Sequence, residues 1–244
     1  MFNLNEGLLH YVYPTAEYVL NYPPLVLIPA ILGICLISYL LGSINSAMII
    51  SRMLYGEDVR TRGSGNAGMT NMLRNYGKGA AGLTLLFDLL KTVISIFIAG
   101  TVFGFQYVGG VSISDFCYVA GIFAMLGHIF PVYYNFRGGK GVLVASTMAL
   151  MLSPIVFAIL FLLFVAIVYL SRYVSLGSVT VGVLYPVVLS GYFSFTFNGT
   201  PMPAFTALSS IVLAIIIVWC HRKNLKRISE RTENKISFGK KSGT

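Results

Sequence analysis

Residues 25–51 read LVLIPAILGICLISYLLGSINSAMIIS and contain no charged side chain. A helix needs about 20 predominantly apolar residues to cross the hydrocarbon core of a bilayer, and this segment is long enough. A backbone in lipid must satisfy its own polar groups, which a helix does within one segment. The stretch therefore predicts a membrane-spanning helix.

The rest of the chain repeats this pattern. Hydrophobic residues make up 56% of the sequence and charged residues 10%, against about 25% charged residues in soluble domains. The alternating pattern of a membrane β-barrel is absent. We predict an all-α, polytopic integral membrane bundle of about seven transmembrane helices. The expected spans are 25–51, 80–103, 116–133, 142–152, 155–170, 177–197 and 205–220, of which the fourth is the shortest.

The positive charges predict the orientation of these helices. Sixteen of the 17 Lys and Arg residues fall on one side of the seven-span arrangement, and the exception, Lys91, lies within the second span. Because cytoplasmic loops carry an excess of Lys and Arg, we expect the N-terminus outside and the C-terminus in the cytoplasm. Residues 1–24 then form an extracytoplasmic extension, 25–233 the membrane domain and 234–244 a disordered cytoplasmic tail.

Several other classes of protein are disfavoured. Cys35, Cys117 and Cys220 fall in apolar spans without a CxxC motif, so we expect free thiols. The net charge of +9 is explained by topology and anionic lipid, so no nucleic-acid partner is expected. The three histidines are far apart without an acidic cluster, so no metal or cofactor is expected. The HxxxxD and GxSxG motifs are absent as well.

The first cytoplasmic loop is rich in glycine and short polar side chains, and reads GSGNAGMTN over residues 63–71. Its glycines allow the backbone to approach a ligand and to point N–H groups at it. Arg74 follows with a planar guanidinium suited to phosphate. The loop predicts phosphate binding, and a flexible loop without a ligand is the alternative. The candidate residues are Gly63, Ser64, Gly65, Asn66, Thr70, Asn71 and Arg74.

The second cytoplasmic loop contains Gly138-Gly139-Lys140-Gly141 directly before the fourth span. A glycine turn at a helix start offers unpaired N–H groups and a favourable dipole, and the lysine adds a full charge. We therefore predict an anion site, and a basic turn that only sets the topology is the alternative. His128, on the preceding apolar stretch, is interpreted as a structural, hydrogen-bonded histidine.

The third candidate segment, HRKNLKR, occupies residues 221–227 after the last span. If the helix continues past the membrane, His221 and Asn224 lie three residues apart and share one face. A basic cluster that only stops membrane transfer is the alternative.

Asp88 and Lys91 form an i, i+3 pair inside the second span. Because charges at that depth are costly, we expect the two to neutralise each other or to bond to a neighbouring helix. The alternative is an ion path, as in a transporter of a phosphorylated solute.

With these segments in view, the sequence resembles the PlsY family, the acyl-phosphate:glycerol-3-phosphate acyltransferases of bacteria. The resemblance covers about residues 36–233. It rests on the ordered motifs LGSI (41–44), GSGN (63–66) with Arg74, Asp88 and Lys91, GH (127–128) with PV (131–132), GGKG (138–141), YVSL (173–176), and HR (221–222) with Asn224. One departure is Arg231, where the family usually has glycine, although Glu233 fits the family's glutamate.

The resemblance implies an enzyme of the bacterial cell membrane with its active site facing the cytoplasm. Its substrates are glycerol 3-phosphate and acyl phosphate, and its product is lysophosphatidic acid. The phosphate of glycerol 3-phosphate is expected to help deprotonate the attacking hydroxyl, and neither coenzyme A nor acyl carrier protein donates directly. Membrane lipid and, transiently, the soluble enzyme that forms acyl phosphate are the implied partners.

The resemblance also implies which residues line the site. Carried over by motif, these are Ser64, Asn66, Thr70, Arg74, Lys140, Ser178, His221 and Asn224. We expect catalytic roles for Ser64, Lys140, His221 and Asn224. The phosphate-binding set is completed by Gly63, Gly65, Asn71, Gly138, Gly139 and Gly141. Acyl phosphate is already an activated anhydride, so orientation and charge stabilisation suffice without a dedicated base.

Overall fold

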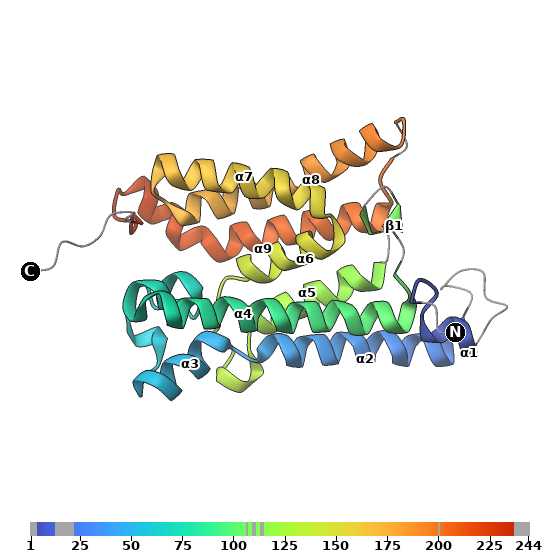
Figure 1. Cartoon of the computed structure of the whole chain (residues 1–244), viewed down its shortest axis with the longest axis horizontal. Coiled ribbons are helices and arrows are strands. Elements are labelled where there is room, and N and C mark those ends of the chain that lie inside the picture. The colour runs from blue at the N-terminus through green and yellow to red at the C-terminus, as the bar shows by residue number, and fades with distance from the viewer. Residues whose placement is uncertain are drawn as a thin grey trace, which may run out of the picture.

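Long apolar helices, packed side by side, make up most of the chain (Figure 1). The computed structural model describes residues 4–12, 22–105, 107–108, 111–112, 115–199 and 201–236. Its helices are α1 (Gly7–Val12), α2 (Pro24–Ser43), α3 (Ser46–Tyr55), α4 (Met69–Phe103), α5 (Asp115–Ile129), α6 (Val142–Leu152), α7 (Pro154–Ser171), α8 (Val174–Thr196) and α9 (Ala204–Ser229), with the 3-10 turns η2 (Val59–Thr61) and η3 (Val132–Tyr134).

The predicted all-helical membrane class is confirmed, with one small addition. Six helical segments of the described chain are long and apolar enough to cross a bilayer, if α2 is counted with α3 and α5 with η3. The addition is a hairpin of two-residue strands, β1 (Tyr107–Val108) and β2 (Val111–Ser112), which pair antiparallel.

The fourth predicted span has the predicted bounds but is short. α6 contains 11 residues, which is about 16 Å of helix against a hydrocarbon core of about 30 Å. α6 ends at Leu152, and α7 begins at Pro154, a residue type that is favoured in the first turn of a helix. Figure 1 shows α6 as a short helix inside the bundle. The count of seven spans therefore stays a prediction.

The first predicted span is interrupted, which the apolar pattern did not reveal. α2 ends at Ser43 and α3 begins at Ser46. Asn45 lies between them, and its side chain accepts a hydrogen bond from the backbone N–H of Met48 at 3.1 Å. Asparagine and serine side chains compete with helical backbone bonds and favour such caps. The residues of α3 therefore form a separate helix.

The second predicted span begins earlier than expected. α4 starts at Met69, directly after the glycine-rich loop, but Gly77 inside it has φ 82° and ψ −172°. Only glycine adopts such angles without strain, so residues 69–76 form a short helix set off from the long one. Polar side chains are frequent in residues 69–76, so the apolar pattern does not predict this segment.

Close packing of small residues joins the central helices. A side chain on Gly42 of α2 would collide with the backbone of Ala124 of α5, and one on Gly127 would meet the backbone of Tyr39. Small residues at such positions let helix backbones approach closely in a membrane. Large apolar side chains such as Phe87 and Leu162 point outward and are about half or more exposed, as expected where lipid surrounds the bundle.

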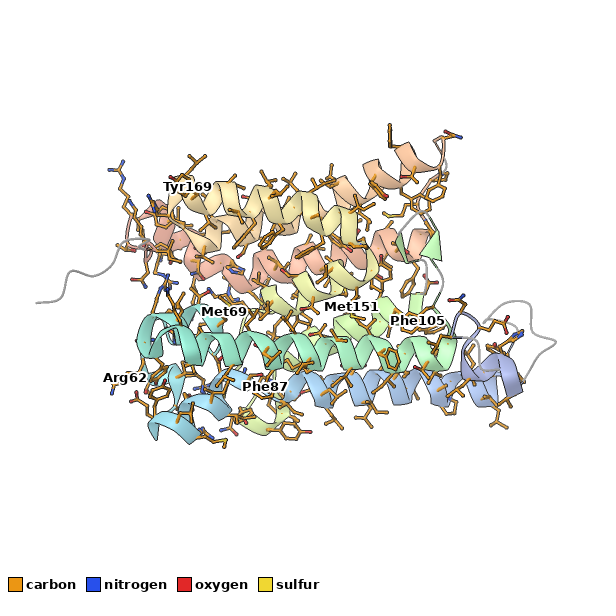
Figure 2. All side chains as sticks on the ribbon, in the orientation of Figure 1. Arg62, Met69, Phe87, Phe105, Met151 and Tyr169 are labelled. Atoms are coloured by element: carbon orange, nitrogen blue, oxygen red, sulfur yellow. The ribbon has the colours of Figure 1, made fainter. Side chains whose placement is uncertain are left out.

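The segments predicted to carry the site lie at one end of the bundle, which we call the loop end. α3, the start of α4 and the C-terminal end of α9 gather there, and the N-terminus lies at the opposite end (Figure 1). In Figure 2, Arg62 marks this loop end, and side-chain nitrogen atoms are concentrated there. The first loop comprises residues 56–68, between α3 and α4, and the second loop residues 130–141, between α5 and α6.

The N-terminal extension contacts the opposite end of α4. Where it is described, the backbone N–H of Phe105 donates to the carbonyl of Leu4 at 3.0 Å. Gly7 approaches the backbone of Gly104 so closely that a side chain there would collide with it. The described part of the extension thus lies at the end of the bundle opposite the loop end.

Candidate active site

A cavity of about 280 Å³ opens at the loop end, between segments that are far apart in the sequence. All three predicted segments contribute to it. Its walls are formed by Ser64, Gly65 and Asn66 from the first loop, Ile129, Gly139 and Lys140 from the end of α5 and the second loop, and Trp219, Cys220, Arg222, Lys223, Asn224 and Arg227 from α9. The predicted convergence of the three segments is therefore observed.

The glycine-rich loop is shaped from beneath by Asn71. Its Oδ1 atom accepts hydrogen bonds from the backbone N–H of Ser64 at 3.0 Å and from the Ser64 hydroxyl at 3.2 Å. Its Nδ2 atom donates to the carbonyls of Val59 and Arg62. Asn71 was predicted to bind phosphate, but it is 1% exposed and lies outside the cavity lining. Because its polar atoms are used by the loop, the structure gives it a shaping role instead.

Arg60 ties the first loop to the second. One guanidinium nitrogen donates to the carbonyl of Tyr134 at 3.1 Å and to that of Arg137 at 3.0 Å. Another lies 2.7 Å from the carboxylate of Asp58. The Arg60 hydrogen bonds are the main reason why the pKa of Asp58 is held well below its usual range. Arg60 therefore hydrogen-bonds the first loop to the second.

The glycine turn of the second loop differs from the prediction in one respect. Its first two amides are not unpaired: Gly138 donates to the carbonyl of Ile129 and Gly139 to that of His128, both at 3.0 Å. Gly139 also lies between the His128 ring and the carbonyl of Ala67, where a β-carbon would collide with both. The turn is therefore a tight contact between the two loops, and Lys140 supplies its charge.

Lys140 begins a network of hydrogen bonds that reaches the end of the described chain. Its ammonium donates to Oδ1 of Asn224 at 2.7 Å, and Nδ2 of Asn224 donates to Glu233 at 2.6 Å. The hydroxyl of Ser175 donates to the same carboxylate at 2.8 Å, and Arg227 does so at 2.7 Å. Glu233 was absent from the predicted site, although its match to the family's glutamate was a usable signal.

The charges of this network are set by its partial burial. The pKa of Lys140 is lowered to about 8, chiefly by burial, with Arg227 and Arg74 acting in the same direction and Glu233 opposing them. For Glu233, burial raises the pKa, but hydrogen bonds from Asn224, Arg227 and Ser175 outweigh it, so the net shift is downward. Near neutral pH an ammonium and a carboxylate thus face each other across Asn224.

His221 and Asn224 share one face of α9, as predicted. They are 2% and 5% exposed, and the helix continues to Ser229. Nδ1 of His221 lies 2.8 Å from the carbonyl of Ile217. A carbonyl only accepts, so Nδ1 carries the proton, and Nε2 of the neutral ring is an acceptor. His221 is not among the residues that line the cavity, whereas Asn224 is.

Other predicted residues lie outside the cavity lining. Ser178 is buried and its hydroxyl donates to the carbonyl of Val174 in its own helix. Arg74 reaches toward the tail, where it donates to the carbonyl of Asn234 at 3.2 Å. Gly63, Thr70 and Gly141 contribute to neither cavity, and Gly138 lines a second one of about 590 Å³ together with Asp58, Arg60, Thr61, Gly65, Asn135 and Arg137.

The tail is ordered further than predicted. The backbone N–H of Ile236 donates to the carbonyl of Arg172 at 2.9 Å, so residues 234–236 are bonded to the bundle. The rest of the predicted disordered tail, 237–244, lies outside the described residues. Arg231 has φ 58°, a conformation that favours glycine. The backbone thus keeps a glycine-like shape at the position where the family usually has glycine.

The charged pair within the bundle is confirmed. Lys91 and Asp88 lie 2.8 Å apart and are nearly fully buried. Lys91 also contacts Nδ1 of His128 at 3.0 Å, so the predicted structural role of His128 is confirmed by its bonding. The three side chains belong to neither cavity lining.

Comparisons with known proteins agree with this site. Residues 32–231 match the family model described as glycerol-3-phosphate acyltransferase. A glycerol-3-phosphate acyltransferase of Syntrophomonas wolfei is 41% identical over 85% of this chain and 96% of its own length. One of Agrobacterium fabrum is 37% identical over 85% and 93%.

The fold is also similar to that of a solved structure. It is the crystal structure of PlsY (YgiH), an integral membrane glycerol 3-phosphate acyltransferase, in its glycerol 3-phosphate form. It superposes with a TM-score of 0.72 at 32% identity, over 85% of this chain and 96% of the other. The chain therefore belongs to the PlsY family of integral membrane glycerol-3-phosphate acyltransferases.

Proposed function

We propose that the chain transfers a fatty acyl group from acyl phosphate to the 1-hydroxyl of glycerol 3-phosphate. The products are lysophosphatidic acid and inorganic phosphate. The observation that carries this proposal is the cavity in which the glycine-rich loop, Lys140 and Asn224 meet. PlsY (YgiH), the solved relative, also has a crystal structure of its lysophosphatidic acid form, which is in keeping with this product.

Lys140 is the proposed partner of a substrate phosphate. Only one bond from its ammonium, to Asn224, is made within the part of the chain that the structure describes. An ammonium has three N–H donors, so two remain for phosphate oxygens. The N-terminus of α6 begins two residues later and adds a favourable dipole. Arg222, Lys223 and Arg227 extend the positive lining.

The apolar part of the cavity lining suits an acyl chain. Ile129 and Trp219 line it, and Trp219 stacks at an angle on Phe130 with the ring centroids 5.7 Å apart. Trp219 is 46% exposed, and its helix is one of those apolar enough to span a membrane. An amphipathic acyl phosphate could thus place its phosphate at the polar wall and its chain toward lipid.

Direct transfer between the two substrates is the proposed mechanism. The hydroxyl oxygen of glycerol 3-phosphate attacks the anhydride carbon, the bond from that carbon to the phosphate oxygen breaks, and inorganic phosphate leaves. The hydroxyl proton passes to a substrate phosphate, as the resemblance implies. The Ser64 hydroxyl donates to Asn71, which is no base. An acyl-serine would need an adjacent general base, so we assign Ser64 to positioning.

The proposed location is the cytoplasmic face of the bacterial cell membrane. The first loop and the C-terminal end of α9, which carry basic residues, lie at the loop end (Figure 1), and such residues are retained on the cytoplasmic side. Single cysteines at Gly138 and Lys226 should resist an impermeant maleimide added to intact cells, whereas one at Asn198 should react. Labelling of the Gly138 position from outside would contradict this orientation.

The test of the reaction uses purified protein with palmitoyl phosphate and labelled glycerol 3-phosphate. We expect lysophosphatidic acid and inorganic phosphate in equal amounts, and no reaction with palmitoyl coenzyme A as the donor. Turnover with the coenzyme A donor alone would refute the proposal. Incubation with acyl phosphate alone, followed by intact mass measurement, should show no adduct, and an acyl group on Ser64 would refute direct transfer.

A further inference from the structure

Lys91 lies at the break between α2 and α3, inside the bundle. Its ammonium donates to the carbonyl of Gly42 at 3.0 Å and to that of Ile44 at 2.9 Å. It also lies 2.8 Å from Asp88 Oδ1 and 3.0 Å from His128 Nδ1. Three N–H donors thus face four acceptors. Lys91 is 5% exposed and has no donor to spare for a substrate.

The position of this ion pair matches the polarity of the broken helix. The last carbonyls of α2 have no helical partners, and they form the negative end of its dipole. Lys91 supplies a cation to them. At the start of α3, the hydroxyl of Ser46 donates to Asp88 at 2.9 Å, so the anion faces a positive helix end. The cluster of Ser46, Asp88, Lys91 and His128 therefore stabilises a break that would be unfavourable in apolar surroundings.

Both loops of the active site rest on residues that this cluster holds. The carbonyl of His128 accepts from Gly139, and the His128 ring packs against the same glycine. On the other side, Asn45 of the break donates to the carbonyl of Ala67 in the first loop at 3.5 Å. A shift of the break or of the His128 ring would therefore move Ala67 and Gly139, which touch each other.

We propose that Lys91 is a positioning residue: by holding the α2–α3 break and His128, it sets the distance between the two phosphate-binding loops. It acts through Asn45 and His128 and touches no substrate. This inference rests on the proposed function in that it takes both loops to bind substrate phosphate. If Lys91 only neutralised Asp88, removing both charges together would leave the two loops unchanged.

The test is therefore the double variant Asp88→Asn with Lys91→Met, which removes both charges at similar side-chain size. Backbone hydrogen exchange is measured by mass spectrometry on the protein in detergent, and steady-state kinetics with glycerol 3-phosphate follow. We expect faster exchange confined to peptides covering residues 63–68 and 137–141. The KM for glycerol 3-phosphate should rise about 10- to 100-fold, with a smaller change in kcat, because the loops lose their geometry.

Ser95→Ala is the matched control. Ser95 is buried on the same helix, and its hydroxyl donates to the carbonyl of Lys91 in that helix. This variant should keep wild-type loop exchange and KM. Unchanged loop exchange in the double variant would overturn the proposal. So would an equal rise in exchange in every helix, since the cluster would then serve general stability.

Lys91→Arg keeps the proposal falsifiable if the double variant does not fold. It retains the charge, but a planar guanidinium cannot reproduce the contacts of a compact ammonium in the same space. We expect a smaller, loop-confined rise in exchange and KM, and wild-type values for both would overturn the proposal. Exchange needs no substrate. A failure of the proposed reaction in the wild-type protein is therefore distinguishable from a failure of this inference.

Discussion

Lys91 and Lys140 each lie near a histidine in space, yet the structure uses them differently. Lys91 has four acceptors around three N–H groups and is 5% exposed. Within the described residues, Lys140 makes one hydrogen bond, to Asn224, and it borders a cavity. A saturated lysine fixes structure, whereas a lysine with spare donors at a cavity can bind an anion. Lys91 is also buried, whereas Lys140 is partly exposed.

The two histidines beside them repeat the contrast. His128 contacts Lys91 with one ring nitrogen and packs against Gly139 with the other. His221 bonds to its own helix through Nδ1, which leaves Nε2 as an acceptor near Lys140. The cluster around Lys91 thus contacts the loops outside the cavity, whereas Lys140 and Asn224 line the cavity itself.

The largest expected effect on activity comes from disturbing the contact of Gly139 with His128 and Ala67. Gly139→Ala places a β-carbon against the His128 ring and the carbonyl of Ala67, so the loops must separate. We expect kcat/KM to fall about 100-fold or more, because misplacement of about 1 Å can have that effect. Gly79→Ala, whose β-carbon meets nothing within 4 Å, should leave activity unchanged. Near-normal activity of Gly139→Ala would refute the contact.

Removal of the Lys140 ammonium should have the next largest effect on activity. Lys140→Ala deletes a charge-assisted bond worth about 1.5–3 kcal/mol, so kcat/KM for glycerol 3-phosphate should fall about 10- to 100-fold. Arg74→Ala, which removes a cation that lies outside the cavity lining, should have a smaller effect of the same kind. Lys78→Ala, an exposed lysine of the same end, is the control. Normal kinetics for Lys140→Ala would mean that the cavity binds no phosphate.

A pH profile sharpens the same point. Burial lowers the pKa of Lys140 to about 8, so the ammonium is present below that pH and is lost above it. The kcat/KM for glycerol 3-phosphate should therefore fall about tenfold per unit above about pH 8. Lys140→Arg stays charged over this range, and its lower activity should not show the fall. An identical fall in this variant would assign the titration to another group.

The smallest expected effect concerns the tail that carries Glu233. Arg231 holds φ 58°, which disfavours a side chain by about 1–2 kcal/mol, while glycine adds some entropy to the unfolded chain. Arg231→Gly should therefore raise the free energy of unfolding by about 1 kcal/mol. The thermal unfolding midpoint in detergent measures this. Lys223→Gly, inside α9, should lower the free energy of unfolding by a similar amount. A decrease for Arg231→Gly as well would contradict backbone strain at Arg231.

Much of the site could be predicted because its signals are local. Glycine spacing, basic residues beside apolar spans, and the i, i+3 pairs at Asp88 and Asn224 are all visible in short stretches, and the structure brings these segments together. Glu233 and Ser175 were not predicted as site residues. The role of the Glu233 carboxylate becomes visible only from the three donors that the fold brings to it. Asn71 and Ser178 lie outside the cavity lining, because a polar residue beside a motif can equally well bond to the backbone around it.

The sequence by itself determined the membrane class, the gathering of charged loops at one end, and the three segments of the site, because hydropathy and loop charge act through the bilayer and need no tertiary contact. Only the tertiary structure decided where α2 breaks, which glycine amides are already paired, and which lysine is saturated. Those properties depend on how many donors and acceptors meet at one point, and such points are built from residues far apart in the chain.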